Sequence, residues 1–449
     1  MNIDSKIGFK SIGVLLFVMV FLCFGCSDKQ SVRSIDPRKV NFEVSYDVNF
    51  DGIMYPSLIM GMANYNGKSE SDFFSYKVTS PKNNSVLRIV MDSSLMNYVT
   101  IFQTILPEKG KTYMFYPLVK WKYDNLIRLK QPGKVDLTFT CYINDEEVDV
   151  KNMRLNYRTI NECLLGIRDT ANNYIDYRWM FAAFVNEEHP WLDVMLNRIL
   201  EQNVVNRFVG YQLGEKEVLN QVFAIWYFIQ TKGIKYSSIS NTSKYSKKVN
   251  SQYIRFFDEV YRNQQANCID ACAFMASILK KIGLNPIIFV EPKHAYLGFY
   301  KDTNKKKLVL LETTLAGNVD LLSIDDRLDT ITGMLSEEDL KIYEKYLTAK
   351  DMEAYKNGRM SLEKLKQTIS RSNFNNAINY NIERYNKNKK YFANTNNDRY
   401  QKLVIKELRE LVQPIRSISE RYPLKVLSMQ DVAIQRRYDG ETRLNELSM

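Results

Sequence analysis

A change in hydrophobic period near residue 160 constrains the fold of this chain more than any other feature of its sequence. Before that point apolar and polar residues alternate, as in Val40–Phe50 and again in Val135–Ile143, and a period of two is typical of a half-buried strand. After about Asn161 the apolar residues recur at helical spacing, as in 191–199 and 218–229. We therefore expect a multidomain α+β protein whose first folded domain is built of strands.

Short alternating segments divided by Gly, Pro and Asn clusters predict a β-sandwich over residues 39–157. Asp51-Gly52 and Pro132-Gly133 are turn signals. Besides the two segments above, strands are predicted at Phe74–Val78, Leu87–Met91 and Tyr113–Phe115. Several short strands at this spacing are typical of an immunoglobulin-like sandwich. No catalytic residue pattern occurs in this region, so it is interpreted as a spacer or a binding module.

The first 26 residues form a targeting segment. Lys6 and Lys10 precede an apolar run of fourteen residues, Ile12–Gly25, which ends at Cys26. This run is too short to span a hydrocarbon core of about 30 Å but suits a signal peptide. It resembles a bacterial lipoprotein signal of the Bacteroidetes type, followed by a polar linker at 27–38; an ordinary secretory signal and an uncleaved anchor are the alternatives. The resemblance implies lipidation of Cys26 and anchoring to outer-membrane lipid in the cell envelope, on the periplasmic or the surface face.

Composition narrows the class of protein and its partners. With 45% hydrophobic and 25% charged residues the chain is not disordered throughout. The formal net charge of +11 permits contact with anionic surfaces, but nucleic acid is not an expected partner of an exported protein, and the basic stretch 384–391 is interpreted as a solvated helix face. Four cysteines of the exported part lack a disulfide framework and are expected to be free thiols: Cys141, Cys163, Cys268 and Cys272.

Residues 264–314 carry the chemistry. Asn267 can cap a helix whose first turn holds Cys268, and Gly283 can end that helix. A cysteine at a helix N-terminus lies at the positive end of the macrodipole, which favours the thiolate. Cys272, one turn further on, is interpreted as a core residue.

An imidazole and a carboxylate follow this helix on a predicted hairpin. His294 begins an apolar strand, and a polar turn centred near Thr303 leads to a second strand that ends at Glu312. This register places His294 directly opposite Glu312, with Cβ atoms about 4.5–5.5 Å apart. The thiol, the imidazole and the carboxylate would then supply a nucleophile, a base and an orienting acid.

The same segments carry a resemblance to a known family. Five pieces match its pattern: Ile229–Tyr236, Asn267-Cys268, Gly283–Pro286, His294-Ala295 and Glu312–Thr314. They resemble the transglutaminase-like superfamily, the circularly permuted relatives of papain-like cysteine proteases. The resemblance implies a catalytic domain at 160–335. The charged stretch from Ser336 onwards by itself predicts a mostly helical region at 336–449.

The resemblance also implies roles for single residues. Cys268 would be the nucleophile, His294 the general base and acid, and Glu312 the orienting acid. Two departures from the family pattern are Ala266 in place of a common glycine and Glu312 in place of a common aspartate. The candidate oxyanion donors are the Cys268 N–H and the side chains of Gln264 or Gln265.

The sequence leaves three functions open. The leading hypothesis is a membrane-anchored cysteine hydrolase that cuts peptide or amide bonds through a thioester; the alternatives are an inactive binding or scaffolding lipoprotein and a peptidoglycan-directed amidase. Neither a cofactor nor a metal is predicted, because the two histidines lie far apart and the cysteines lack ligand spacing. The second histidine, His189, is expected at a helix start or on the surface.

Overall fold

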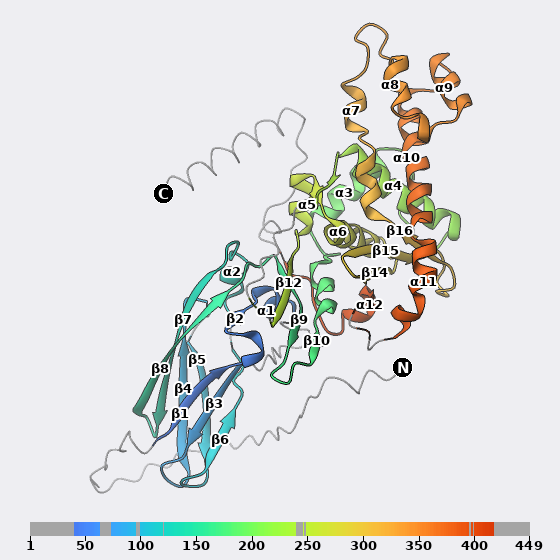
Figure 1. Ribbon diagram of the computed structural model, residues 1–449. Coiled ribbons are helices and arrows are strands. Elements are labelled where there is room, and N and C mark those ends of the chain that lie inside the picture. Colours follow the sequence, from blue (N-terminus) through green and yellow to red (C-terminus); the bar gives the residue numbers. More distant parts are fainter. Residues whose placement is uncertain are drawn as a thin grey trace.

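The computed structural model describes residues 40–62, 73–95, 99–119, 121–238, 246, 248–394, 397 and 399–416. The predicted signal peptide with Cys26, the linker at 27–38 and the chain after residue 416 lie outside the described residues. The protein is a mixed α+β structure, with strands gathered at one end of an elongated molecule and most helices at the other (Figure 1).

Two sheets, whose strands pair antiparallel except for β2 (Ile53–Met54) with β8 (Glu146–Tyr157), pack face to face at the strand-rich end. One has the order β1 (Phe42–Tyr46), β3 (Phe74–Thr79), β6 (Thr112–Phe115). The other has the order β2 (Ile53–Met54), β8 (Glu146–Tyr157), β7 (Gly133–Ile143), β4 (Ser85–Asp92), β5 (Thr100–Leu106). Every second residue of β3 is buried, and Phe74 and Tyr76 meet Phe139 of the facing sheet at ring distances of 5.8 and 5.9 Å. The four predicted strands at 74–78, 87–91, 113–115 and 135–143 are confirmed.

The predicted strand at Val40–Phe50 is too long. Strand β1 covers only Phe42–Tyr46, and Val48–Phe50 forms the 3-10 turn η2. The Asp47 carboxylate accepts a hydrogen bond from the Asn49 N–H at 2.9 Å, and Asp51 has a left-handed backbone with φ of 54°. A side chain that accepts a hydrogen bond from the backbone N–H two residues later favours a turn over strand pairing. The alternation of apolar and polar residues does not reveal this hydrogen bond.

A small central sheet connects the two ends of the molecule. Its order is β10 (Tyr174–Asp176), β9 (Glu162–Arg168), β12 (Val249–Tyr253). The Arg158 guanidinium and the Glu162 carboxylate form a buried ion pair beside it, and the Ser251 hydroxyl also donates to Glu162 at 3.0 Å. Because a buried charge is tolerated only when it is paired, this pair fixes the end of the strand-rich part, at Arg158, to β9.

A four-stranded antiparallel sheet forms the centre of the helix-rich end. Its order is β16 (Leu308–Leu311), β15 (His294–Tyr300), β14 (Pro286–Glu291), β17 (Gln401–Val404). All six residues of β14 are buried, as a strand covered on both faces requires. Helix α6 (Cys268–Lys281) packs against β14 and β15, while Phe289 and Tyr296 pack with Phe392 of α11 (Ile382–Ala393). The sheet thus lies between α6 and a helix from the C-terminal region.

Other helices surround this centre. Helix α10 (Leu362–Tyr380) packs on α4 (Glu215–Thr231) and on β16. Residues beyond the predicted boundary at 335 therefore supply both strand β17 and the helix α10 that packs on the four-stranded sheet. The predicted helices at 191–199 and 218–229 are confirmed by α3 (Trp191–Leu200) and α4. The remaining helices are α1 (Pro56–Met62), α2 (Tyr123–Leu126), α3 (Trp191–Leu200), α5 (Phe257–Asn263), α7 (Leu322–Asp325), α8 (Glu337–Lys341), α9 (Ala349–Lys356), α12 (Ile405–Leu408) and the 3-10 turns η3 (Arg178–Phe184), η4 (Thr313–Asn318) and η5 (Glu344–Tyr346).

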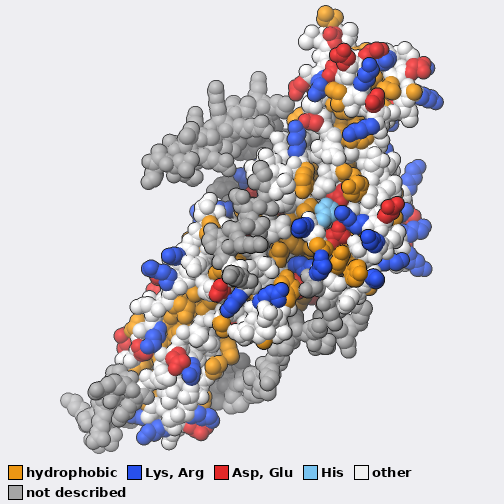
Figure 2. Space-filling view, viewed as in Figure 1, with side chains coloured by type: hydrophobic (Ala, Val, Ile, Leu, Met, Phe, Trp, Pro, Cys, Tyr) orange, Lys and Arg blue, Asp and Glu red, His pale blue; other side chains and the backbone are white. Residues whose placement is uncertain are grey.

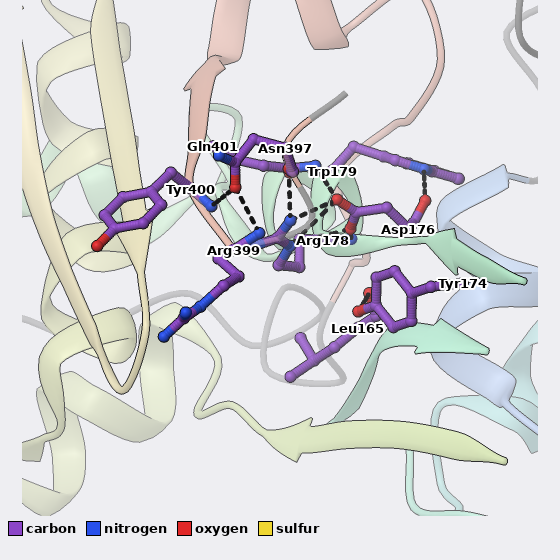
Figure 3. Close-up of polar contacts among 9 residues, drawn as sticks. All are labelled: Leu165, Tyr174, Asp176, Arg178, Trp179, Asn397, Arg399, Tyr400 and Gln401. Atoms are coloured by element: carbon purple, nitrogen blue, oxygen red, sulfur yellow. Dashed lines mark hydrogen bonds and ion pairs between the residues drawn. The ribbon is translucent and has the colours of Figure 1, made fainter. Parts of the chain in front are cut away.

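A polar cluster holds the start of β17 in place (Figure 3). The Arg178 guanidinium, which is almost fully buried, donates to Asp176 Oδ2 at 2.6 Å and to the Asn397 carbonyl at 3.3 Å. The Gln401 amide donates to the same Asp176 oxygen. Residues more than two hundred positions apart are therefore joined through one carboxylate.

Replacing the buried guanidinium is expected to loosen β17. Arg178→Ala leaves Asp176 with an uncompensated charge, which typically costs about 3 kcal/mol of the free energy of unfolding. Urea denaturation measures this loss, and hydrogen exchange should show faster amide exchange in residues 401–404. Arg154→Ala, which removes an exposed arginine paired to Asp136, is the matched control and should change stability little. Equal effects of the two substitutions would contradict the role given to Arg178.

Candidate active site

The start of α6 is fixed by a reciprocal cap. Asn267 Oδ1 accepts hydrogen bonds from the N–H groups of Ile269 and Asp270 at 3.0 and 2.9 Å, and Asp270 Oδ2 accepts from the Asn267 N–H at 3.0 Å. Gly283, with φ of +84°, follows the last turn as predicted. The cap places Cys268 at the first helical position, and this thiol is half-buried whereas the other three cysteines among the described residues are buried.

A buried ion pair between Asp270 and Arg255 holds the capping residue Asp270 in place. The Asp270 carboxylate is fully buried and accepts from the Arg255 guanidinium at 2.6 Å. Burial raises the pKa of Asp270, and hydrogen bonds from the backbones of Asn267 and Arg255 and from the guanidinium act against this rise. Helix α6 is therefore anchored to the segment that leaves the central sheet, which limits the positions open to Cys268.

A tight hairpin presents His294 beside this helix. Glu291 and His294 form the last pair of the β14–β15 ladder, so Pro292 and Lys293 make a two-residue turn, and Lys293 has a left-handed φ of 65°. His294 Nε2 lies 2.8 Å from Glu312 Oε2. The Cys268 side chain is near enough to this imidazole to contribute to its raised pKa. The structure thus brings together all three residues that the sequence analysis selected: Cys268, His294 and Glu312.

The predicted register of the hairpin is wrong by two residues. Strands β15 and β16 pair with Leu297 opposite Leu311, which centres the turn one residue later than expected, so Glu312 is not directly opposite His294. A shift of two keeps both side chains on one face of the sheet. Glu312 lies just after β16, and its long side chain bridges the diagonal.

Three further groups hold the Glu312 carboxylate. The Asn381 amide donates to Oε2 at 2.9 Å, the Thr314 hydroxyl donates to Oε1 at 2.6 Å and the Thr314 N–H to Oε1 at 3.2 Å. The Glu312 side chain is only 1% exposed. Burial opposes its charge, but the contacts with His294, Thr314 and Asn381 outweigh burial and lower the pKa of Glu312. This acid is therefore an anion whose orientation is fixed.

The pKa values of the two histidines are shifted in opposite directions. Burial lowers the pKa of His294, yet its hydrogen bonds to Cys268 and Glu312 prevail and raise it to about 9. Burial lowers the pKa of His189 to about 4, and its Nδ1 accepts from the Trp191 N–H at 3.2 Å. His189 thus sits at a helix start, as one expectation had it, but not on the surface.

Acidic and aromatic groups surround the site. Figure 2 shows histidine reaching the surface at the helix-rich end, among basic, acidic and hydrophobic side chains. Burial raises the pKa of Tyr236, and the charges of Cys268 and Glu312 add to this rise. Burial also raises the pKa of Glu291, against the opposing charges of Arg384 and His294. Of these two acids, Glu312 has a lowered pKa and Glu291 a raised one.

Of the two side chains considered for the oxyanion, the structure gives Gln264 another partner and leaves Gln265 exposed. Gln264 has a left-handed backbone, and its amide donates to the Lys232 carbonyl at 2.7 Å. Gln265 is exposed and pairs through its backbone with Lys235, in the two-stranded ladder of β11 (Lys235–Tyr236) and β13 (Gln265–Ala266). Cys272 is a buried core residue, with its sulfur 3.6 Å from the Thr313 hydroxyl.

Sequence reasoning missed Asn381. This residue is fully buried between α10 and α11, more than a hundred residues after the cysteine, in a stretch where asparagines are common. No local pattern distinguishes it, since its role depends only on the packing of α10 against β16. The Glu312 N–H also donates to the Ala377 carbonyl of α10 at 3.1 Å, which fixes the same contact through the backbone.

Comparisons with known proteins do not assign a family. No family model matches the chain, and no curated protein is significantly similar to it. Within the described part of the chain, no three His, Cys, Asp or Glu side chains gather in a way that could hold a metal ion. No helix in that part is long and apolar enough to cross a membrane.

Two separate histidine titrations are expected. Because the chain has two histidines, NMR of ¹³C-labelled imidazole should show one group titrating near pH 9 and one near pH 4. The folded state binds the His294 proton more tightly than the unfolded state, so this contribution to stability is complete below pH 6.5 and is lost towards pH 9. For His189 the unfolded state binds the proton more tightly, so stability falls as the pH decreases from 6.5 towards 4. Two titrations near pH 6.5 would contradict the site.

Removing the amide of Asn381 is expected to weaken the hold on Glu312. In Asn381→Ala the carboxylate loses one donor, so its pKa should rise. The acid titration of the His294 resonance reports this change, because the ring senses protonation of its partner. Asn379→Ala, an exposed position on the same helix, is the control and should leave that titration in place. An unchanged acid titration in Asn381→Ala would show that Asn381 only fills space.

Proposed function

We propose that this protein is a cysteine hydrolase that cuts peptide or amide bonds through a Cys268–His294–Glu312 triad. The observation that carries the proposal is the 2.8 Å contact of His294 Nε2 with the buried Glu312 carboxylate; the thiol at the start of α6 is near enough to the same imidazole to help raise its pKa. A nucleophile, a base and an orienting acid in this order are the parts that thiol-based acyl transfer requires.

Each residue has a defined part in the proposed reaction. Glu312 occupies Nε2 of His294, so Nδ1 is the ring nitrogen left for the thiol, and proton transfer from sulfur to Nδ1 gives a thiolate beside an imidazolium. The sulfur forms a bond to the carbonyl carbon of the substrate, and the Cys268 N–H is the candidate donor to the oxyanion because Asn267 caps the next two N–H groups. The imidazolium then gives its proton to the leaving amine as the C–N bond breaks.

Water completes the cycle. Neutral His294 accepts a proton from water, the hydroxide adds to the thioester carbon, and the C–S bond breaks to release the acid and the thiolate. Hydrolysis is favoured over transfer to another amine because water is the abundant acceptor at an exported site. The raised pKa of His294 keeps the imidazolium available as an acid up to about pH 9.

The fold and location belong to the same proposal. The order of helix, strand and strand that carries Cys268, His294 and Glu312 supports a transglutaminase-like core, and the two packed sheets before it support an immunoglobulin-like sandwich. The signal-like segment that ends at Cys26 supports export and attachment to membrane lipid. Peptides, proteins or the peptides of peptidoglycan are then the substrates within reach.

Alkylation of the thiol tests the triad without a known substrate. We expect Cys268 to react with iodoacetamide at pH 6, and the rate to fall about a hundredfold in His294→Ala because the imidazolium partner is lost. Glu312→Gln, which keeps the size of the side chain but not its charge, should reduce the rate less. Cys268→Ala shows how much label reaches other cysteines. A wild-type rate equal to that of His294→Ala would favour an inactive binding or scaffolding protein.

A further inference from the structure

Strand β5 is an outer strand of the five-stranded sheet and lacks the features that usually protect such a strand. It pairs with β4 on one side, and no described strand pairs with its other side. Its seven residues, Thr100–Leu106, include no charged residue, no proline and no glycine, and its register with β4 has no bulge. Charges, proline, bulges and short length are the usual means by which proteins keep an outer strand from pairing with another chain.

The other strands of the sandwich that have an unpaired side are short or charged. Strand β2 has two residues and β6 has four. The Glu43 side chain of β1 pairs with Lys77 of β3 at 3.2 Å. Strand β8 is largely unpaired beyond the two residues that contact β2, but it carries charged residues at positions 146, 147, 149, 151 and 154. Among the described strands of the sandwich, β5 alone combines length with the absence of charge.

Two isoleucines of β5 point away from the sandwich core, one on each side of Gln103. Ile101 and Ile105 are each 59% exposed, whereas Phe102 packs inward on an aromatic ring of β6. The residues opposite these isoleucines on β4 are half-buried valines. A β-branched residue stabilises a sheet mainly through neighbours on its own face, and on the outer side of β5 the described chain supplies none.

The outward residues of β5 have the same order in both directions from Gln103. If two copies of β5 pair antiparallel with Gln103 opposite its own copy, each Ile101 lies opposite Ile105 of the other copy. Side chains that are directly opposite have Cβ atoms about 4.5–5.5 Å apart and stabilise the pair when both are apolar. A charge at the central position would meet itself, but Gln103 is neutral and its amide can both donate and accept a hydrogen bond. Strand β5 therefore fits a second copy of itself.

Charges at the two ends of β5 are complementary in this arrangement. Asp92, at the end of β4, lies next to the start of β5, and Lys109 follows the other end of β5. Both are exposed, and neither forms an ion pair within the described part of the chain, whereas Glu108 is already paired with Lys111. Antiparallel pairing places the start of each strand beside the end of the other, so the end with Asp92 meets the end with Lys109 of the second copy.

From these observations we propose that two copies of this protein pair through β5, antiparallel about Gln103, so that their five-stranded sheets join into one continuous sheet. The interface is isologous, because each copy contributes the same residues. Backbone hydrogen bonds along β5 supply affinity, and the isoleucine pairs bury apolar surface. The inference does not depend on the hydrolase proposal, because β5 lies at the strand-rich end and the proposed triad at the helix-rich end (Figure 1).

Charge substitutions at Gln103 test the pairing and its register. Sedimentation velocity of the full chain in detergent should show a dimer for the wild type. Gln103→Lys and Gln103→Glu each place like charges directly opposite one another, so the Kd of the dimer should rise about tenfold in either variant. An equimolar mixture of the two variants places opposite charges there and should restore a dimer. Because Gln103 is exposed, both variants should keep the wild-type fold, which circular dichroism checks.

Asn152→Lys is the matched control. Asn152 is also an exposed amide residue, but it lies in β8 on the far side of the same sheet, so this variant should remain dimeric. A wild type that stays monomeric overturns the inference and leaves β5 to a strand of another protein. A dimer that neither Gln103 variant weakens also overturns it, as do two weakened variants whose mixture forms no dimer.

Disulfide trapping tests the same geometry without a measurement of affinity. In Gln103→Cys the two new thiols lie opposite each other across the two-fold axis, within the Cα separation of about 4.4–6.8 Å that a disulfide requires. After mild oxidation, mass spectrometry of the unreduced digest should find a peptide joined to its own copy through residue 103. This peptide should be about ten times more abundant than the corresponding one from Asn152→Cys, whose thiols are far apart in the proposed dimer. Equal yields from the two variants overturn the inference.

Discussion

The buried carboxylate of Glu312 imposes the constraint on which the helix-rich end depends. A charge without access to water has to be surrounded by donors, and here they come from separate places in the chain: His294 on β15, Thr314 in η4 and Asn381 after α10. Sheet, turn and C-terminal helix must therefore all be in position before the charge is satisfied. The C-terminal region is part of the site for this reason and not an appendage to it.

The same hydrogen-bond network shifts the pKa values of two neighbouring acids, Glu312 and Glu291, in opposite directions. Glu312 collects donors and has a lowered pKa, while burial raises that of Glu291, although both carboxylates lie near His294. Arg384 of α11 pairs with Glu291 at 3.2 Å. Environment and not residue type thus decides which acid supports the imidazole, and groups whose pKa values are pushed apart are typical of acid–base sites.

The position of the thiol depends on a second buried charge. Asp270 serves both the cap of α6 and the pair with Arg255, so the Cys268 thiol is tied to the central sheet as well as to its own helix. The central sheet is joined in turn to the strand-rich end through Arg158 and Glu162. Rigid support of this kind is what a reactive group needs, since a small displacement of sulfur from the imidazole weakens their contact.

The sequence by itself determined the parts that local chemistry controls. Asn267 and Gly283 predicted the bounds of α6, alternation predicted β3, β4, β6 and β7, and the order of Cys268, His294 and Glu312 predicted the members of the site. The alternating pattern did not predict the local effect of Asp47, whose carboxylate accepts a hydrogen bond from the Asn49 N–H and ends the first strand early.

Only the tertiary structure decided the rest. The register of β15 and β16 depends on where the turn closes, and β17 and Asn381 come from segments far from the strands and side chains that they contact. A helix cap and a hydrophobic period both involve residues only a few positions apart, so they can be recognised in a single sequence. The donors of a buried carboxylate are chosen by packing between distant elements, and no local pattern records that choice.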